Sequence, residues 1–399
     1  MALLSVAEAL ARVTQGLEPL EPERVPLEQA RGRVLAEDVA ARLTQPPFDA
    51  SAMDGHAVRA ADVATLPATL RLIGESLAGR GFDGEVGQGE AVRIFTGAPV
   101  PKGADTVVIQ EDTEAASGVV SVKEAAPRRH IRPRGQDFTE GEVLLRAGTR
   151  LGPRELMLAA AMNHAELLVR RKPKVAILAT GDEVVPPGTA LDRDQIVSSV
   201  PAGLAALIEA QGGEPMSLGI AQDTPESLVT LARTGSAADI LVTVGGASVG
   251  ERDLVSAALR SEGMELDFWK IAMRPGKPLI FGRLGNQRVL GMPGNPVAAL
   301  ICGLVFLVPM LHRLLGLREE ARRPHEAILG QALEVNGPRE HYMRATSHWK
   351  ASERRVTPLP AQDSSLMADF ARADCLIVRP PDAPALAAGE RVTIIPLDS

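Results

Sequence analysis

A glycine-rich segment follows a strongly apolar run near the middle of the chain. Residues 238–244 are rich in β-branched side chains, and Gly245, Gly246 and Gly250 come soon after them. Glycine lets the backbone approach a phosphate closely, and the free N–H groups of a following helix start favour an anion. This pattern predicts a phosphate-binding loop between a buried strand and a helix. Asp253 stands at the expected helix start, where helix capping alone would also explain it.

A second turn places two carboxylates behind another apolar run. Residues 174–179 lead into Thr180, Gly181, Asp182 and Glu183. A carboxylate pair at the end of a strand suits metal binding or proton transfer. A polar turn that only caps the next segment is the competing interpretation, and on this motif alone we favour it.

A third turn contains Pro293, Gly294, Asn295 and Pro296. Asn295 is typical of a helix cap and Pro296 of a first helical residue, an arrangement that leaves backbone N–H groups free for an anion. A rigid helix start without a ligand explains the motif equally well. Three such turns in one part of the chain favour a nucleotide or another phosphate-bearing ligand.

Three cations lie close together ahead of the third turn. Lys270, Arg274 and Lys277 share a segment with Pro275 and Pro278, which restrict its backbone. Lysine offers a point charge and arginine a bidentate fork, so we expect a stiff loop that receives an oxyanion. A solvated charged loop is the alternative. It fits poorly with a stiff segment in a chain of net charge −7.

The N-terminal half contains three more polar segments, residues 48–57, 93–99 and 132–137. They combine Asp, Ser, Thr and Gly, which usually form turns. None of the three indicates a function by itself.

Several elements must position these residues, and the first of them is an N-terminal helix. Ser5 and Glu8 form a capping-box pattern, and Gly16 ends the helix that it predicts. A short strand-like run follows at residues 33–39. Because residues 140–171 return to a helical pattern, we group them with residues 1–42.

The segment between these two parts has a different character. Residues 43–139 contain many glycines and prolines and short β-type runs, which predict a small inserted β domain. At the other end of the chain, residues 319–399 are expected to form short strands with proline turns, as a small barrel or a sandwich. Charged residues that end in Pro324 suit a linker before these strands.

Residues 172–318 alternate between strand and helix patterns. This alternation predicts a doubly wound α/β domain with a mainly parallel sheet, in which ligands bind beyond the carboxyl ends of the strands. The expected strands and helices are 174–179, 240–244 and 288–291, and 202–211, 225–233, 253–261 and 296–315. The apolar run within 297–311 is too short to span a membrane, so we interpret it as a buried core helix.

Composition excludes several classes of function. The chain has 399 residues, 45% of them apolar, and a net charge of −7, which argues against nonspecific nucleic-acid binding. Its seven histidines lack metal-site spacing. The two cysteines form no CxxC pair and suit a reducing cytoplasm, and no signal peptide or membrane span is expected.

Taken together, six motifs resemble the molybdopterin molybdenumtransferase family, which includes the MoeA proteins and the E domain of gephyrin. They occur in the order of the family, and a looser match follows at Arg344 and residues 362–364. The six motifs are residues 51–55, 95–101, 180–183, 245–250, 274–278 and 293–296.

The resemblance implies the last step of molybdenum cofactor biosynthesis. In that step molybdate is inserted into adenylylated molybdopterin and AMP is released. It also implies a homodimer of four-domain protomers, with the active site between the α/β domain of one chain and the inserted domain of the other. The implied protomer has a MogA-like doubly wound α/β domain, an inserted β domain, an elongated linking domain and a C-terminal β-barrel. Other cofactor-biosynthesis proteins are further expected partners.

The resemblance also assigns residues. We expect Mg²⁺ as cofactor, held by Asp54, Glu183 and Asp253. The implied catalytic residues are these three acids together with Thr96, Lys270, Arg274 and Lys277. The implied substrate-binding residues are Asp137, Thr180, Gly181, Asp223, Gly245, Gly246, Ser248, Gly250, Pro293, Gly294, Asn295, Arg344 and Ser364.

Three positions depart from the family pattern. Arg274 stands where relatives often have Lys, which keeps the charge but changes the geometry. Ser199 replaces a common Asn, and Ala373 precedes Asp374 without the neighbouring Asn.

Two other functions are alternatives. An adenylyltransferase that makes the adenylylated pterin would use only a related α/β domain, so residues 1–171 and 319–399 weigh against it. A dimeric scaffold, as the gephyrin E domain is, is the non-enzymatic alternative. No fused partner domain or long linker supports it in this sequence.

Overall fold

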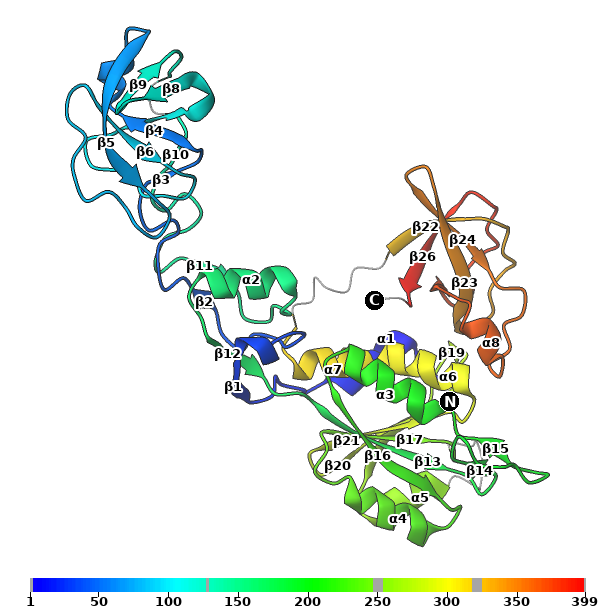
Figure 1. Ribbon diagram of the computed structural model, residues 1–399. Coiled ribbons are helices and arrows are strands. Elements are labelled where there is room, and N and C mark those ends of the chain that lie inside the picture. Colours follow the sequence, from blue (N-terminus) through cyan, green and yellow to red (C-terminus); the bar gives the residue numbers. More distant parts are fainter. Residues whose placement is uncertain (1–2, 127–128, 247–253, 318–324, 398–399) are drawn as a thin grey trace.

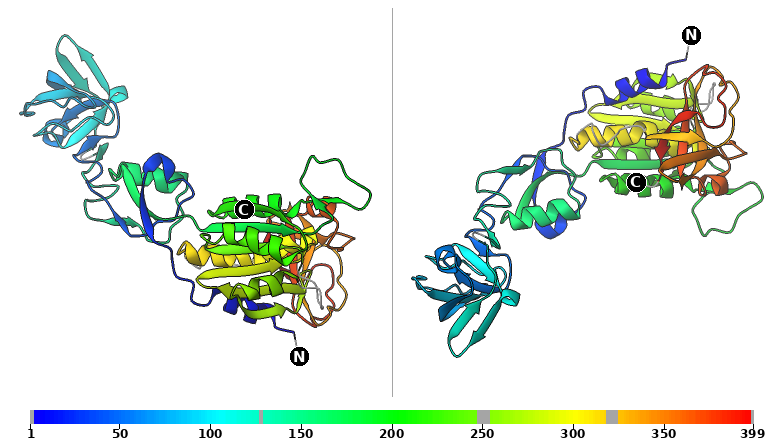
Figure 2. Two further views of the ribbon diagram at one scale, coloured as in Figure 1. Left: turned by 90° about the horizontal axis from the view of Figure 1, so that it is seen from below. Right: turned by 90° about the horizontal axis from the view of Figure 1, so that it is seen from above.

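The computed structural model describes residues 3–126, 129–246, 254–317 and 325–397. The molecule is elongated (Figure 1). The inserted β region lies at one end, and the α/β region and the C-terminal strands lie together at the other. The linking region lies between these ends, and both views in Figure 2 show the same order.

The α/β region contains a six-stranded sheet in the order β16-β13-β17-β21-β20-β18. The first four strands are parallel, whereas β20 runs antiparallel to both of its neighbours. The predicted, mainly parallel sheet is confirmed. Its strands are β13 (Lys174–Thr180), β16 (Glu214–Ala221), β17 (Ile240–Val244), β18 (Glu265–Lys270), β20 (Pro278–Leu284) and β21 (Gln287–Met292).

Helices pack on both faces of this sheet (Figure 1). A short parallel pair, β14 (Val184–Val185) and β15 (Ile196–Val197), extends from one end. The helices are α3 (Val200–Ala210), α4 (Pro225–Thr234), α5 (Leu254–Ser261), α6 (Pro296–Cys302) and α7 (Val308–Leu314), with a π-helical segment (Gly303–Leu307) joining the last two.

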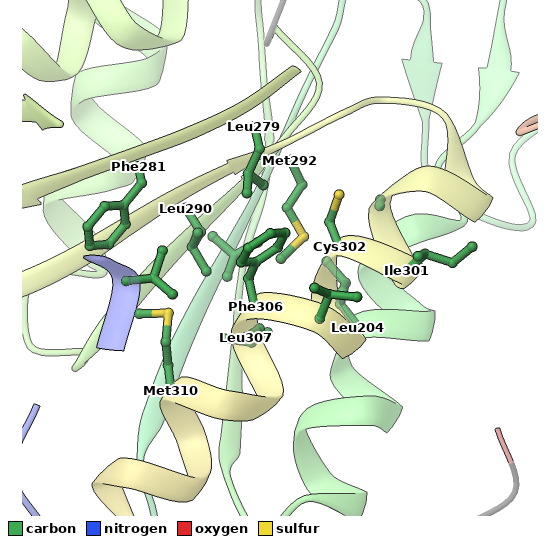
Figure 3. Packing of buried hydrophobic residues seen from close by; sticks show 14 of the residues in the cluster. Leu204, Leu279, Phe281, Leu290, Met292, Ile301, Cys302, Phe306, Leu307 and Met310 are labelled. Carbon is green, nitrogen blue, oxygen red and sulfur yellow. The ribbon is translucent and has the colours of Figure 1, made fainter. Parts of the chain in front are cut away.

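The core of this region lies between the sheet and the helical segment Pro296–Leu314. Figure 3 shows Phe281 and Leu290 from the sheet packed near Phe306 and Met310 from that segment. Burying each such side chain stabilises the fold by roughly 1.5–3 kcal/mol. By length and composition the segment could cross a membrane, but 78% of its most apolar window is buried inside the protein. It is therefore the core helix that the sequence predicts.

The N-terminal helix α1 (Val6–Thr14) has the predicted capping box. The Ser5 hydroxyl accepts from the Glu8 amide at 3.2 Å, and the Glu8 carboxylate accepts from the Ser5 amide at 3.0 Å. Val6, Ala9 and Val13 are buried in the α/β core, where α1 contacts α7. The apolar face of α1 therefore packs on the α/β region, although the sequence led us to group it with the linking part.

The linking region is crossed twice by the chain. β1 (Pro22–Pro26) pairs with β12 (Glu166–Arg170), and β2 (Val39–Ala40) pairs with β11 (Val143–Leu145), both antiparallel. The helix α2 (Pro153–Ala161) contributes Ala159 to their shared core, as its apolar pattern predicts. The strand expected at 33–39 is mostly wrong. Only its last residue lies in β2, while Val34 and Leu35 form isolated bridges.

The inserted region is a small β structure, as predicted. Its six-stranded sheet has the order β7-β4-β6-β5-β9-β8, and β3 (Ala50–Ser51) pairs with β10 (Ile131–Arg132) beside it. Its strands are β4 (Gly55–Val58), β5 (Ala68–Ser76), β6 (Glu90–Ile94), β7 (Thr106–Ile109), β8 (Thr113–Ala116) and β9 (Val119–Val122).

The C-terminal strands form a closed barrel rather than a sandwich. It closes because β23 pairs with both β24 and β25, and the short helix α8 (Met367–Phe370) lies between β24 and β25 in the chain. One strand from the α/β region, β19 (Met273–Arg274), joins it by pairing with β23. The barrel strands are β22 (His325–Leu329), β23 (Glu340–Lys350), β24 (Glu353–Pro358), β25 (Cys375–Arg379) and β26 (Arg391–Pro396).

Candidate functional site

A cavity of about 780 Å³ lies at the carboxyl ends of β13, β17 and β21. These strands end where the three predicted turns begin, which is the usual ligand position in an open α/β sheet. The cavity thus brings together many of the residues singled out in the sequence. Its predicted lining residues are Thr180, Gly181, Glu183, Asp223, Gly245, Gly246, Gly294 and Asn295.

Close backbone contact explains the glycine at the end of β17. Gly245 has a φ of +90°, and a Cβ atom there would lie 2.7 Å from the Thr180 carbonyl oxygen. The Gly245 amide donates to the Met292 carbonyl at 3.3 Å, which joins this turn to the end of β21. The turns after β13, β17 and β21 are therefore packed against one another and form a continuous backbone wall.

Carboxylates gather at the mouth of the cavity. The Asp223 amide donates to Asp182 Oδ1 at 3.0 Å. Partial burial, followed by the negative charges of Asp182 and Glu183, raises the pKa of the Asp223 carboxyl. Negative charge is therefore concentrated here, and carboxylate oxygens are the ligands that Mg²⁺ prefers. Within the described ranges, no three His, Cys, Asp or Glu side chains are grouped as a metal site.

Part of the cavity lining is apolar, which the sequence did not lead us to predict. Ile196 and Val197 of β15 are 56% and 42% exposed and line the cavity together with Leu254 and Met367. The chain between β14 and β15 projects from the α/β region (Figure 2). The sequence feature that could have indicated this apolar lining is the pair of β-branched residues, Ile196 and Val197, next to a polar turn. Ser199, one of the departures from the family pattern, also lines the cavity.

The C-terminal barrel supplies part of the cavity wall. Ser364 Oγ accepts from Asn295 Nδ2 at 2.9 Å, and the Ser364 carbonyl accepts from the Val297 amide at 3.3 Å. The neighbouring Ser365 lines the cavity. Arg344 lies beneath this segment in β23 with only 1% of its surface exposed. The cavity is therefore built from two parts of the fold.

The three predicted cations surround a short connection rather than a free loop. Lys270 ends β18, Arg274 lies in β19, and Lys277 precedes β20, so the stiff loop expected around these cations is partly strand. The Lys270 ammonium lies 3.7 Å from the ring centroid of Trp269. Arg274 and Lys277 are exposed. None of the three lines the cavity in this structure.

The predicted residues of the inserted region form a separate group. The Thr96 amide and hydroxyl both donate to Asp54 Oδ1, at 2.7 Å and 2.9 Å, and these bonds lower the pKa of the Asp54 carboxyl. Asp137 lines a second cavity of about 500 Å³ together with Gly97. Within one chain this group lies at the opposite end of the molecule from the α/β cavity (Figure 1).

The remaining predicted residues are placed as follows. Pro293 is buried at the end of β21, next to the cavity. Ser248, Gly250 and Asp253 lie outside the described residues. Their expected roles, and the assignments above, stay predictions.

Three family models match this chain along most of its length. Residues 4–163 match the MoeA N-terminal region (domain I and II), and residues 326–397 match the MoeA C-terminal region (domain IV). Residues 176–313, which supply most of the cavity lining, match a probable molybdopterin binding domain. The fold and the site thus define a multidomain, molybdopterin-processing enzyme.

Individual relatives narrow this class further. A molybdopterin molybdenumtransferase from Haemophilus influenzae is 36% identical over 99% of both chains. A molybdopterin molybdenumtransferase 2 from Mycobacterium tuberculosis is 35% identical over 98% of both. A crystal structure of a MoeA protein of molybdopterin biosynthesis from Pyrococcus horikosii superposes with a TM-score of 0.85, at 32% identity and 100% coverage of both chains. The chain belongs to the molybdopterin molybdenumtransferase family, whose members are transferases of molybdenum cofactor biosynthesis.

Proposed function

We propose that this transferase inserts molybdate into adenylylated molybdopterin and releases AMP. The observation that carries the proposal is the cavity at the strand ends. It joins a glycine backbone wall, a carboxylate cluster and an apolar side. Such a cavity suits a flat heterocycle linked to phosphates, with the ring on the apolar side and the phosphates on the backbone side.

Phosphate binding falls to the backbone in this proposal. The Gly245 amide already donates to Met292 and the Val297 amide to Ser364, so we assign phosphate binding to the amides of Gly246, Gly294 and Asn295, which line the cavity. Phosphoanhydride cleavage depends mainly on positioning and charge neutralisation, so a covalent nucleophile is not required. Lys270, Arg274 and Lys277 are proposed to attract molybdate and to offset the charge that develops.

We further propose that Mg²⁺ is held by Glu183 with Asp253 and Asp54. The concentration of carboxylate oxygens around Asp223 fits a hard divalent cation. When bound, the ion would neutralise charge on the phosphates. Because ionised carboxylates repel phosphate oxygens, they would act by holding the ion, while the backbone wall positions the phosphates.

The position of Asp54 and Thr96 supports a homodimer in this proposal. Because this pair lies far from the cavity of its own chain, we propose that it serves the cavity of a partner chain. Thr96 would then bring its hydroxyl to the incoming substrate. Two buried free cysteines support a cytoplasmic location, since thiols stay reduced there.

The test is an assay with purified protein, adenylylated molybdopterin, Mg²⁺ and molybdate. We expect molybdate-dependent AMP release together with active molybdenum cofactor, and a loss of at least about 100-fold in Glu183→Gln enzyme. Glu214→Gln is the matched control, because Glu214 is an exposed carboxylate at the amino end of β16.

Two outcomes would contradict the proposal. Formation of adenylylated pterin from molybdopterin and ATP, without AMP release, would identify an adenylyltransferase instead. Cofactor synthesis that stays intact in a deletion strain would favour a scaffold. A synthesis defect that high molybdate restores would support the enzyme.

A further inference from the structure

One side chain of the barrel, Gln362, takes the place of a strand partner. β24 ends at Pro358, opposite Ala345, so Arg344 lies just beyond the part of β23 that pairs with β24. Arg344 still pairs with Leu376 of β25, and its carbonyl also accepts from the Leu359 amide at 2.8 Å. There Gln362 Oε1 accepts from the Arg344 amide at 2.9 Å, and Gln362 Nε2 donates to the Arg344 carbonyl at 3.0 Å. Nε2 also donates to the Leu359 carbonyl at 2.8 Å. The amide thus satisfies three backbone groups at once.

Arg344 binds the same segment from its other side. Its guanidinium donates to the Ala361 carbonyl at 3.1 Å and to the Leu366 carbonyl at 3.3 Å. Residues 361–366, here named the serine turn, are therefore fixed at both ends. Inside the turn, Asp363 Oδ1 accepts from the amide and the hydroxyl of Ser365, at 2.9 Å and 2.6 Å. These bonds leave the turn little conformational freedom.

The serine turn faces the α/β cavity. Ser364 bonds Asn295 and the Val297 amide at the start of α6, and Ser365 lines the cavity. The same strand β23 also pairs with β19 through His341 and Arg274. A single barrel strand therefore holds two segments that border the α/β region.

We propose that Gln362 is a positioning residue of the transfer reaction, which sets the serine turn on Asn295 and so fixes one wall of the substrate cavity. This inference rests on the proposed function. Gln362 does not line the cavity, so it acts through Ser364 and Ser365. Loss of its three bonds should loosen the wall that receives the substrate and leave the carboxylates untouched.

Steady-state kinetics test this role with two glutamine variants. We expect Gln362→Ala to raise KM for adenylylated molybdopterin roughly tenfold while kcat changes less than about threefold. Gln287→Ala is the matched control. Gln287 Nε2 also donates to two backbone carbonyls, at 2.8 Å and 2.9 Å, but it lies at the amino end of β21, away from the cavity. We expect the KM of Gln287→Ala enzyme for adenylylated molybdopterin to stay unchanged.

A second variant provides a readout that general loss of structure would not give. Gln362→Glu keeps the acceptor but, when ionised, points an oxygen at the Arg344 and Leu359 carbonyls. Protonation of the introduced carboxylate restores a donor. The ratio of the KM of Gln362→Glu enzyme to that of wild type, measured at the same pH, should therefore fall towards one as the pH is lowered through the carboxyl range. Hydrogen exchange should rise in residues 361–367 and at the start of α6 in Gln362→Ala.

The outcomes separate the two proposals. An inactive wild-type enzyme would refute the proposed function and, with it, this role of Gln362. An active wild type with unchanged KM in Gln362→Ala, or equal KM increases in Gln362→Ala and Gln287→Ala, would refute only the role of Gln362.

Discussion

At the scale of single residues, the carboxyl group of Asp223 shows that negative charges lie close together at the cavity. Its pKa is raised by partial burial and by the carboxylates of Asp182 and Glu183. An acid with a raised folded-state pKa stabilises the fold at low pH, and that contribution is lost as the pH rises through its folded pKa. At neutral pH the ionised carboxylate therefore opposes folding slightly, unless a cation is bound beside it.

This sign gives a prediction for Asp223→Asn. Without divalent ions, the variant should have a higher free energy of unfolding than wild type at pH 7, and so a higher Tm. The gain should be less than about 1 kcal/mol because the side chain is largely exposed. The difference should shrink as the pH falls below the carboxyl range. Mg²⁺ should raise the Tm of wild type more than that of Asp223→Asn. Thermal unfolding across pH, with and without Mg²⁺, measures both effects, and a gain that persists at low pH would contradict this account.

Arg344 shows what sequence reasoning misses at this scale. Its position in the motif predicts a substrate-binding cation, and that role stays a prediction. The motif did not indicate that the guanidinium is buried under the serine turn. Burial depends on which strands neighbour β23, and those come from distant parts of the chain. The sequence likewise could not show that Thr96 donates to Asp54, because these hydrogen bonds join residues 42 positions apart.

At the scale of elements, the turn after β17 depends on glycine for two separate reasons. Gly245 combines a positive φ with a close approach to Thr180. Gly263 has a similar φ of +96°, but an added Cβ would meet nothing within 4 Å. The two positions therefore separate backbone strain from steric contact.

We expect Gly263→Ala to destabilise the protein by roughly 1–3 kcal/mol through backbone strain alone. Gly245→Ala should destabilise it more and should also weaken AMP binding, because the turn must move away from Thr180. Thermal unfolding and calorimetric titration with AMP measure the two effects. Equal stability losses with unchanged AMP affinity would show that the contact at Thr180 is unimportant.

Elements with uniform burial were the easiest to predict. The strand expected at 240–244 matches β17, since all five of its residues are buried and apolar or β-branched. By contrast, β16 contains Pro215 and Gly219 and alternates in exposure at the edge of the sheet, so its sequence resembles a loop. The strands β18 and β20 were obscured by the charges and prolines between them, which we interpreted as one loop.

At the scale of the whole molecule, the proposed function pairs Asp54 of one chain with the α/β cavity of another, so in this proposal each active site needs two chains. Asp54→Ala and Glu183→Ala proteins should each be inactive alone. After dissociation and reassociation of an equal mixture, about one quarter of wild-type activity should return, because half of the dimers are mixed and each mixed dimer has one intact site.

Size-exclusion chromatography would establish the dimer, and the AMP-release assay would measure the recovery. A mixture of two Asp54→Ala samples carrying different tags serves as the control and should stay inactive. Failure of the mixed sample, despite proven exchange of chains, would place both groups in one protomer's site and contradict the shared arrangement.

The packing of α1 on α7 has a consequence for how the chain folds during synthesis. The apolar face of α1 finds its partner only after about 300 further residues, which at roughly 5–20 residues per second means a delay of about 15–60 s. The strand pairings of the inserted β region join only residues within the region, so its sheet can form during that delay. We therefore expect nascent chains to contain a folded β region while α1 still exposes Val6, Ala9 and Val13. Chaperones that bind unfolded chains would recognise this apolar surface.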